Sequence, residues 1–101
     1  MEKTSEITIV ATAIALQNEE LNLRREQEKL VTETLKEKGC IRYELHQSKD
    51  DPRVLVFVET WASEEDWRAH MQGEAIKKFQ ASGAARWIAD FTLYRMTKIA
   101  G

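Results

Sequence analysis

Residues 54–61 limit the possible folds of this chain more than any other segment, because they read as a strand that is apolar on both faces. The segment is Val-Leu-Val-Phe-Val-Glu-Thr-Trp, and successive side chains of a strand point to opposite faces. Its three valines share one face, and the other face carries Leu55, Phe57, Glu59 and Trp61. Because an exposed apolar sheet face is a liability, both faces of the sheet that holds this strand are expected to be covered.

Three further segments predict strands. They span 7–16, which is rich in β-branched residues, 40–47 and 91–99. In the strand 40–47 the alternation places one set on one face, Ile41, Tyr43 and Leu45, and a polar set on the other, Arg42, Glu44 and His46. Turn-forming residues at 48–52 separate this strand from 54–61, so the two are predicted to form a hairpin.

Two helical segments lie between the strands. The first is predicted over 19–38, with Asn18 as its N-cap and Gly39 as the residue that ends it. Its buried stripe is expected to comprise Leu23, Leu30, Val31, Thr34 and Leu35. The second helical segment begins after the N-cap Ser63, is interrupted by Gly73, and ends near residue 83.

The order β-α-β-β-α-β predicts one ferredoxin-like α+β domain over residues 1–101, with a four-stranded antiparallel sheet and both helices on one face. Two helices cover only one face of such a sheet. The strand 91–99 is also apolar on both faces. We therefore expect a second copy of the chain to cover the open sheet face, which makes the protein a homodimer. The alternative is a central strand that is merely apolar.

Composition excludes several classes of function. Fifteen Lys and Arg against seventeen Asp and Glu give a net charge of −2, which offers no basic surface to nucleic acid. No apolar run approaches the ~18 residues of a membrane helix, and residues 1–6 lack the apolar stretch of a signal peptide. A single cysteine predicts a cytoplasmic protein without an internal disulfide. Cys40, His46 and His70 show no metal-ligand spacing.

Motifs for nucleotides, metals and activated nucleophiles do not occur, so the candidate site residues are isolated polar side chains. His70 lies one helical turn after Trp67, where a histidine beside apolar surface can exchange a proton near neutral pH. The alternative is a half-exposed histidine with a structural hydrogen bond. Glu59 shares a face with apolar residues and must be paired, exposed or shifted in its pKa. Pairing with Arg42 or Arg95 across strands is the structural alternative.

Other side chains are candidates for the lining of a pocket. Tyr43 is either part of a site or a core aromatic residue with a satisfied hydroxyl. Gln27 interrupts the buried stripe of the first helix, which indicates a pocket or only helix curvature. Tryptophans at 61, 67 and 87 indicate an aromatic cavity or simply fill a small core. Arg86 and Trp87 follow a turn and could close such a cavity as a loop.

Two stretches resemble the antibiotic biosynthesis monooxygenase (ABM) domain family, which includes quinol and anthrone oxygenases. The first is Glu-Lys-Gly-Cys-Ile-Arg-Tyr-Glu-Leu-His-Gln at 37–47. The second is Val-Glu-Thr-Trp-Ala-Ser at 58–63, followed by Trp67 and the tripeptide Ala-His-Met at 69–71. The resemblance runs from about residue 7 to residue 96. It implies a dimeric ferredoxin-like α+β barrel with a pocket between sheet and helices in each protomer.

The resemblance also implies a cofactor-independent monooxygenase that oxidises a quinol, an anthrone or a related phenolic with O₂, without flavin, haem or metal. Its helix histidine corresponds to His70, its strand tyrosine to Tyr43, and its E-x-W motif to Glu59 and Trp61. We accordingly expect His70, Tyr43 and Glu59 to be catalytic. The expected substrate-binding residues are Trp61, Trp67, Trp87, Arg86 and Gln27.

The chain departs from the family pattern at one position, because many relatives carry a second histidine where Ala75 stands here. The resemblance therefore does not imply a mechanism that needs two histidines. Haem-degrading relatives carry an asparagine on the first strand and a haem-ligating histidine downstream. This chain has Ala11 and Thr12 on that strand and Gln80 at the place of the ligand, so a haem-degrading function is disfavoured. The alternatives to an oxygenase are a non-enzymatic dimeric module that binds small aromatics and an isomerase of a small carbonyl compound.

Overall fold

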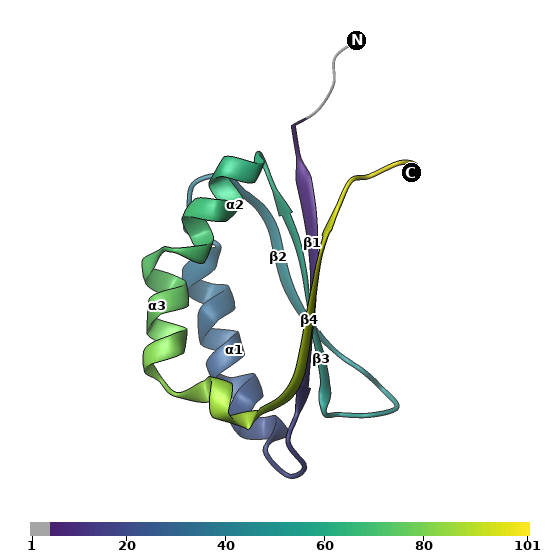
Figure 1. Ribbon diagram of the computed structural model, residues 1–101, viewed down its shortest axis with the longest axis vertical. Coiled ribbons are helices and arrows are strands. Elements are labelled where there is room, and N and C mark those ends of the chain that lie inside the picture. Colours follow the sequence, from purple (N-terminus) through teal and green to yellow (C-terminus); the bar gives the residue numbers. More distant parts are fainter. Residues whose placement is uncertain (1–4) are drawn as a thin grey trace.

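The computed structural model describes residues 5–101 and shows one antiparallel sheet with all helices on one side (Figure 1). The strands are β1 (Ile7–Ala15), β2 (Cys40–Gln47), β3 (Val54–Trp61) and β4 (Ile88–Met96). The helices are α1 (Glu20–Thr34), α2 (Glu64–Met71), α3 (Glu74–Ala81) and the short 3₁₀ helix η1 (Ala84–Trp87). Residues 1–4, which include most of the segment considered above for a signal peptide, lie outside the described part.

The strand order β2-β3-β1-β4 confirms the predicted ferredoxin-like arrangement. β1 pairs antiparallel with β3 and β4, and β2 pairs with β3 as the predicted hairpin. The predicted second helix is the pair α2 and α3, which Gly73 separates as expected. Within residues 5–101, none of the helices has the length and apolar character that a bilayer crossing requires.

β3 shows the alternation on which the fold prediction rests. Leu55, Phe57, Glu59 and Trp61 are buried under the helices, whereas the residues between them on the opposite face are partly exposed. The core forms where this face meets α1, and its largest fully buried side chains include Trp61, Ile9, Leu23 and Leu55. The alanines of β1 at 11, 13 and 15 are also buried. Small side chains on this central strand leave room between the sheet and the helices.

The first helix is shorter than the prediction of 19–38 and begins differently. Asn18 does not cap it, because its backbone is in the left-handed region at φ 71°, and Glu19 takes the N-cap position without a side-chain cap. α1 ends at Thr34, since amide bonds from Lys36 and Glu37 reach back only three residues and tighten the last turn. Leu35, predicted to be buried, is therefore 55% exposed.

Two strand predictions also need correction. The register of β2 against β3 shifts between Cys40 and Arg42, so Ile41 does not share the buried face of Tyr43 and is 54% exposed. Cys40 packs against the core instead. The last strand starts at Ile88 rather than 91 and ends at Met96, because η1 turns the chain directly into the sheet.

Candidate functional site

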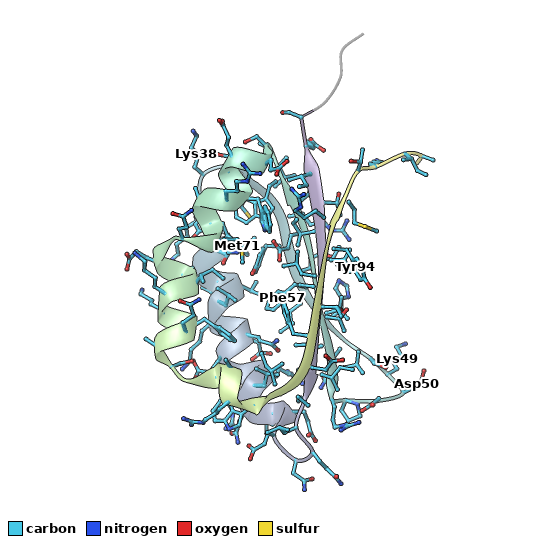
Figure 2. All side chains as sticks on the ribbon, in the orientation of Figure 1. Lys38, Lys49, Asp50, Phe57, Met71 and Tyr94 are labelled. Carbon is cyan, nitrogen blue, oxygen red and sulfur yellow. The ribbon has the colours of Figure 1, made fainter. Side chains whose placement is uncertain are left out.

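A cavity of about 110 Å³ lies between the sheet and the helices. Its wall combines four polar side chains, from Gln27, Tyr43, Glu59 and His70, with mainly apolar ones. The polar residues come from four different elements, α1, β2, β3 and α2. In Figure 2, Phe57 from the sheet and Met71 from α2 reach into the space between the two layers, and both belong to the cavity wall. The fold therefore brings four of the candidate polar residues to one place, and Arg86 is not among them.

His70 is 2% exposed, so the half-exposed histidine considered above is not what the fold contains. Its Nδ1 lies 2.7 Å from Oε1 of Glu37, a residue of the turn between α1 and β2. Its ring lies against Trp61, at 4.7 Å between centroids, and against Tyr43, at 5.3 Å. Burial lowers the pKa of His70, and the hydrogen bond and charge of Glu37 oppose that fall.

Glu59 is 4% exposed and accepts a hydrogen bond from Nε1 of Trp61 at 2.9 Å. Burial raises the pKa of Glu59 to about 7, against the opposing effect of that hydrogen bond. The structural alternative, in which Glu59 pairs with Arg42 or Arg95 across strands, is wrong. Arg42 lies on the open face of the sheet and pairs with Glu44, and Arg95 pairs with Glu64 of α2. Glu59 is therefore a carboxyl group that can be neutral or charged near neutral pH.

Tyr43 and Gln27 complete the polar part of the wall. Burial and the nearby Glu59 keep the pKa of Tyr43 far above its ordinary value, so its phenol stays neutral. Gln27 is 1% exposed, and in the described part of the chain its Oε1 is a buried acceptor without a hydrogen-bond partner. An unsatisfied buried acceptor costs about 1–3 kcal/mol. A ligand hydroxyl inside the cavity could relieve that cost, which favours the pocket over mere helix curvature.

The tryptophans lie differently from the expected aromatic lining. Trp61 is fully buried behind the cavity, where it holds Glu59 and contacts His70. Trp67 is half-buried at the edge of the main core cluster. Trp87 packs against a separate cluster, and the exposed Arg86 stacks 4.5 Å above its ring. Trp67, Arg86 and Trp87 thus lie outside the wall of this cavity, and their role in binding stays a prediction.

Sequence reasoning overlooked the residues that line the cavity in their place. Besides Tyr43 and His70, the aromatic part of the lining is supplied by phenylalanines from three elements, Phe57, Phe79 and Phe91. Met71 and Phe91 are 41% and 51% exposed although they belong to the wall, so they mark its opening between α2 and β4. Phe91 could have been found from its place on the helix-facing side of its strand. Glu37 gave no such signal, because the sequence predicted it in the last turn of the first helix, whereas it lies in the turn that follows α1.

The fold and the cavity define a class of protein: a ferredoxin-like α+β domain with an enclosed site between sheet and helices. A sequence profile of the family described as antibiotic biosynthesis monooxygenase matches residues 8–82. The chain therefore belongs to the ABM family, as its sequence motifs indicated.

Solved structures agree with this fold. Protein PA3566 from Pseudomonas aeruginosa is 24% identical, with a TM-score of 0.89 over 99% of this chain and 100% of that one. Protein SO0527 from Shewanella oneidensis is 26% identical, with a TM-score of 0.85 over 93% and 91%. Rv0793 from Mycobacterium tuberculosis is 19% identical, with a TM-score of 0.86 over 96% and 98%. No curated protein matches the sequence.

Proposed function

We propose that the protein is a cofactor-independent monooxygenase that oxidises a quinol, an anthrone or a related phenolic small molecule with molecular oxygen. The observation that carries this proposal is the placement of His70. Its imidazole is buried, held at Nδ1 by Glu37, and part of the wall of a mainly apolar cavity. Membership of the ABM family supports an activity of this kind. A phenol becomes an electron donor toward oxygen once a base in a dry pocket takes its proton.

The reaction begins with a neutral phenol whose hydroxyl approaches Nε2 of His70, the ring nitrogen that Glu37 leaves free. Nε2 accepts the proton, and the phenolate passes one electron to O₂, which gives a substrate radical and superoxide. The two radicals combine into a carbon–oxygen bond, and the proton held on His70 returns to the peroxide. Loss of water then leaves one oxygen atom in the product. The other oxygen atom leaves with two hydrogen atoms of the substrate, so no external reductant is needed.

The remaining polar groups of the cavity would bind the other oxygen atoms of the substrate. The free acceptor on Gln27 suits a second hydroxyl group, and the neutral Tyr43 can donate to a carbonyl or a phenolate. Glu59 can donate when protonated and accept when ionised. Among the described residues of the wall there is no lysine or arginine. The cavity thus favours an uncharged phenol over a phosphorylated or carboxylated compound.

The size of the cavity bears on which phenol fits. Its volume is about 110 Å³, and an apolar cavity of about 150 Å³ in another protein holds one benzene molecule. The present cavity is smaller than that, so even a single-ring quinol needs some widening at the opening, and small phenols are favoured as substrates. A three-ring anthrone requires the opening residues Met71 and Phe91 to move apart. Both side chains are half-exposed at that opening, and neither makes a polar contact that would hold it.

An isomerase of a small carbonyl compound is the second candidate. The observation that favours it is the presence of two acid–base groups, His70 and Glu59, in the wall of one cavity. Such a pair can move a proton from one carbon to another through an enol. This reaction does not consume oxygen. A binding module without catalysis would show ligand affinity and no turnover of either kind.

Oxygen uptake by the metal-stripped protein tests the proposal. A panel of single-ring hydroquinones and anthrones is used, with rates corrected for autoxidation. We expect saturable uptake with at least one hydroquinone. In His70→Gln we expect a fall of about tenfold or more, which corresponds to ~1.4 kcal/mol of transition-state stabilisation.

His46→Gln is the matched control, because His46 is exposed on the opposite face of the sheet. It should keep the activity of the wild type. Turnover that continues without oxygen would favour the isomerase. Binding without turnover of any compound would favour the binding module.

We also propose that the protein acts in the cytoplasm as a homodimer. The single cysteine supports the location, because proteins of oxidising compartments commonly contain disulfides. The dimer is supported by the apolar residues on the open face of the sheet, among them Val10, Val58 and Tyr94.

A further inference from the structure

Glu37 holds the histidine of the cavity from outside the cavity wall. It lies in the turn between α1 and β2, and its carboxylate reaches His70 on α2, 33 residues further along the chain. The side chain of His70 is 1% exposed and that of Glu37 is 23% exposed. The contact joins Nδ1 to Oε1 at 2.7 Å, which is short for a nitrogen–oxygen hydrogen bond.

Gly73 supplies a second, independent indication that this carboxylate has a defined place. A Cβ added to Gly73 would lie 3.3 Å from Oε2 of Glu37 and 3.2 Å from the carbonyl oxygen of Ala69. The backbone of Gly73 has φ −88° and ψ 179°, a conformation open to any residue. Its lack of a side chain is therefore explained by space rather than by backbone freedom. The break between α2 and α3 leaves room for the carboxylate of Glu37.

We infer that Glu37 is the positioning residue of the proposed base: it accepts the Nδ1–H of His70, so that the imidazole presents an unprotonated Nε2 to the cavity. This inference rests on the proposed function only for its catalytic consequence. A neutral imidazole carries its proton on one nitrogen, and the hydrogen bond made by that nitrogen selects the tautomer. Without Glu37, nothing in the described surroundings of Nδ1 would fix that choice.

The charge of Glu37 matters as much as its geometry. When Nε2 takes a proton, a cation forms beside the rings of Trp61 and Tyr43, where burial disfavours it. The titratable groups around the imidazole are Glu37 from the α1–β2 turn, Tyr43 from β2 and Glu59 from β3. Tyr43 is neutral, and Glu59 is engaged by Trp61. Glu37 is therefore the anion that directly faces the imidazolium.

Nitrogen-15 NMR of histidine-labelled protein tests this inference without any substrate. The chain has two histidines, so each can be followed separately. In the wild type above the pKa of His70, we expect a protonated Nδ1 and a bare Nε2. Glu37→Gln keeps an acceptor oxygen, so the tautomer should persist while proton binding weakens by about tenfold. Glu37→Ala should also lose the preference for one tautomer.

The second histidine provides a matched control. Nε2 of His46 lies 2.9 Å from Oε1 of Glu44, and both side chains are exposed. Glu44→Gln should change the signals of His46 and leave those of His70 unchanged. A proton on Nε2 of His70 in the wild type would overturn the inference. The inference would also be overturned if His70 had the same titration curve and the same tautomer in the wild type, Glu37→Gln and Glu37→Ala.

Kinetics separates the two proposals. If a quinol is turned over, Glu37→Gln should lower kcat by about tenfold with little change in KM, because the anion acts on the proton-transfer step. If no compound is turned over, the proposed function fails, yet the NMR result still decides the role of Glu37. An unchanged kcat in an active enzyme would contradict the catalytic consequence.

Discussion

Glu59 shows at the residue scale how burial determines chemistry. A carboxyl group that is buried in a cavity wall without a cationic partner resists ionisation. The hydrogen bond from the Trp61 N–H offsets only part of that effect. In the folded protein the pKa of Glu59 is raised to about 7 from an ordinary value of 4.5. Between these two values the folded state binds more protons than the unfolded state. Stability must therefore fall as the pH rises through that interval.

We predict that Glu59→Gln removes this loss of stability. Glutamine keeps an acceptor for Trp61 and cannot ionise, so the variant should have a flatter pH dependence between about pH 5 and pH 8. The wild type should lose on the order of 2–3 kcal/mol relative to the variant over that range. Urea unfolding at fixed protein concentration measures the difference. Glu44→Gln, at an exposed position, is the control. Parallel curves for wild type and Glu59→Gln would contradict the prediction.

The polar residues of the cavity could be predicted from periodicity, because it assigns faces. Strand alternation placed Tyr43 and Glu59 on faces that they share with apolar residues, and helical spacing placed Gln27 as an interruption of the buried stripe, but neither pattern told which sheet face the helices cover. His70 followed from its spacing to Trp67 and from the family motif. Glu37 could not be found this way, since it lies in a turn and its contact with His70 depends on how α2 packs over that turn. The lining by phenylalanine rather than tryptophan also depends on packing.

At the element scale, the boundaries that were predicted correctly are those with clear turn chemistry. β2 and β3 run over the predicted residues because Gly39, the 48–52 turn and Ser63 limit them on all sides. The end of α1 was misplaced, because the charged residues 36–38 have helical propensity although the chain already turns there. The start of β4 was missed, because η1 lies immediately before it. Tertiary packing decides both of these boundaries.

The break between α2 and α3 leads to a prediction about Gly73. Alanine is compatible with the φ and ψ of residue 73, but its Cβ would crowd Oε2 of Glu37 and the carbonyl oxygen of Ala69, so for Gly73→Ala we expect a loss of about 1 kcal/mol and a change in the His70 signals. Gly83→Ala is the matched control, because φ 78° makes alanine costly there by about 1–2 kcal/mol. That control should destabilise the protein without affecting His70. Urea unfolding and NMR of both variants make the comparison. Unchanged His70 signals in Gly73→Ala would show that the carboxylate does not need this space.

At the scale of the whole molecule, the two faces of the sheet differ in what covers them. Helices cover one face, and Tyr94 projects from the other (Figure 2). Across that open face Val10 of β1 pairs with Val58 of β3 and Tyr94 of β4, which forms an apolar row over three strands. Tyr94 and Met96 are 58% and 46% exposed. The β2 edge of the same face is ionic and carries Arg42, Glu44 and His46.

The apolar row on this open face predicts that two copies of the chain pack through it as a homodimer. Stacked sheets bury rows of this kind about 10 Å apart, so a second copy can cover the valines of the first. We expect a dimer by light scattering at micromolar concentration, and we expect Val10→Glu to be a folded monomer, because it places a charge at the centre of the row. Leu21→Glu makes the same change at an exposed position of α1, on the other side of the molecule, and should remain a dimer. A wild-type protein that is monomeric would contradict the prediction, and so would a Val10→Glu protein that stays dimeric.

The four polar residues of the cavity all belong to one protomer, namely Gln27, Tyr43, Glu59 and His70. A folded monomer should therefore keep its ligand cavity. Loss of activity in Val10→Glu would show that the second copy contributes to the reaction.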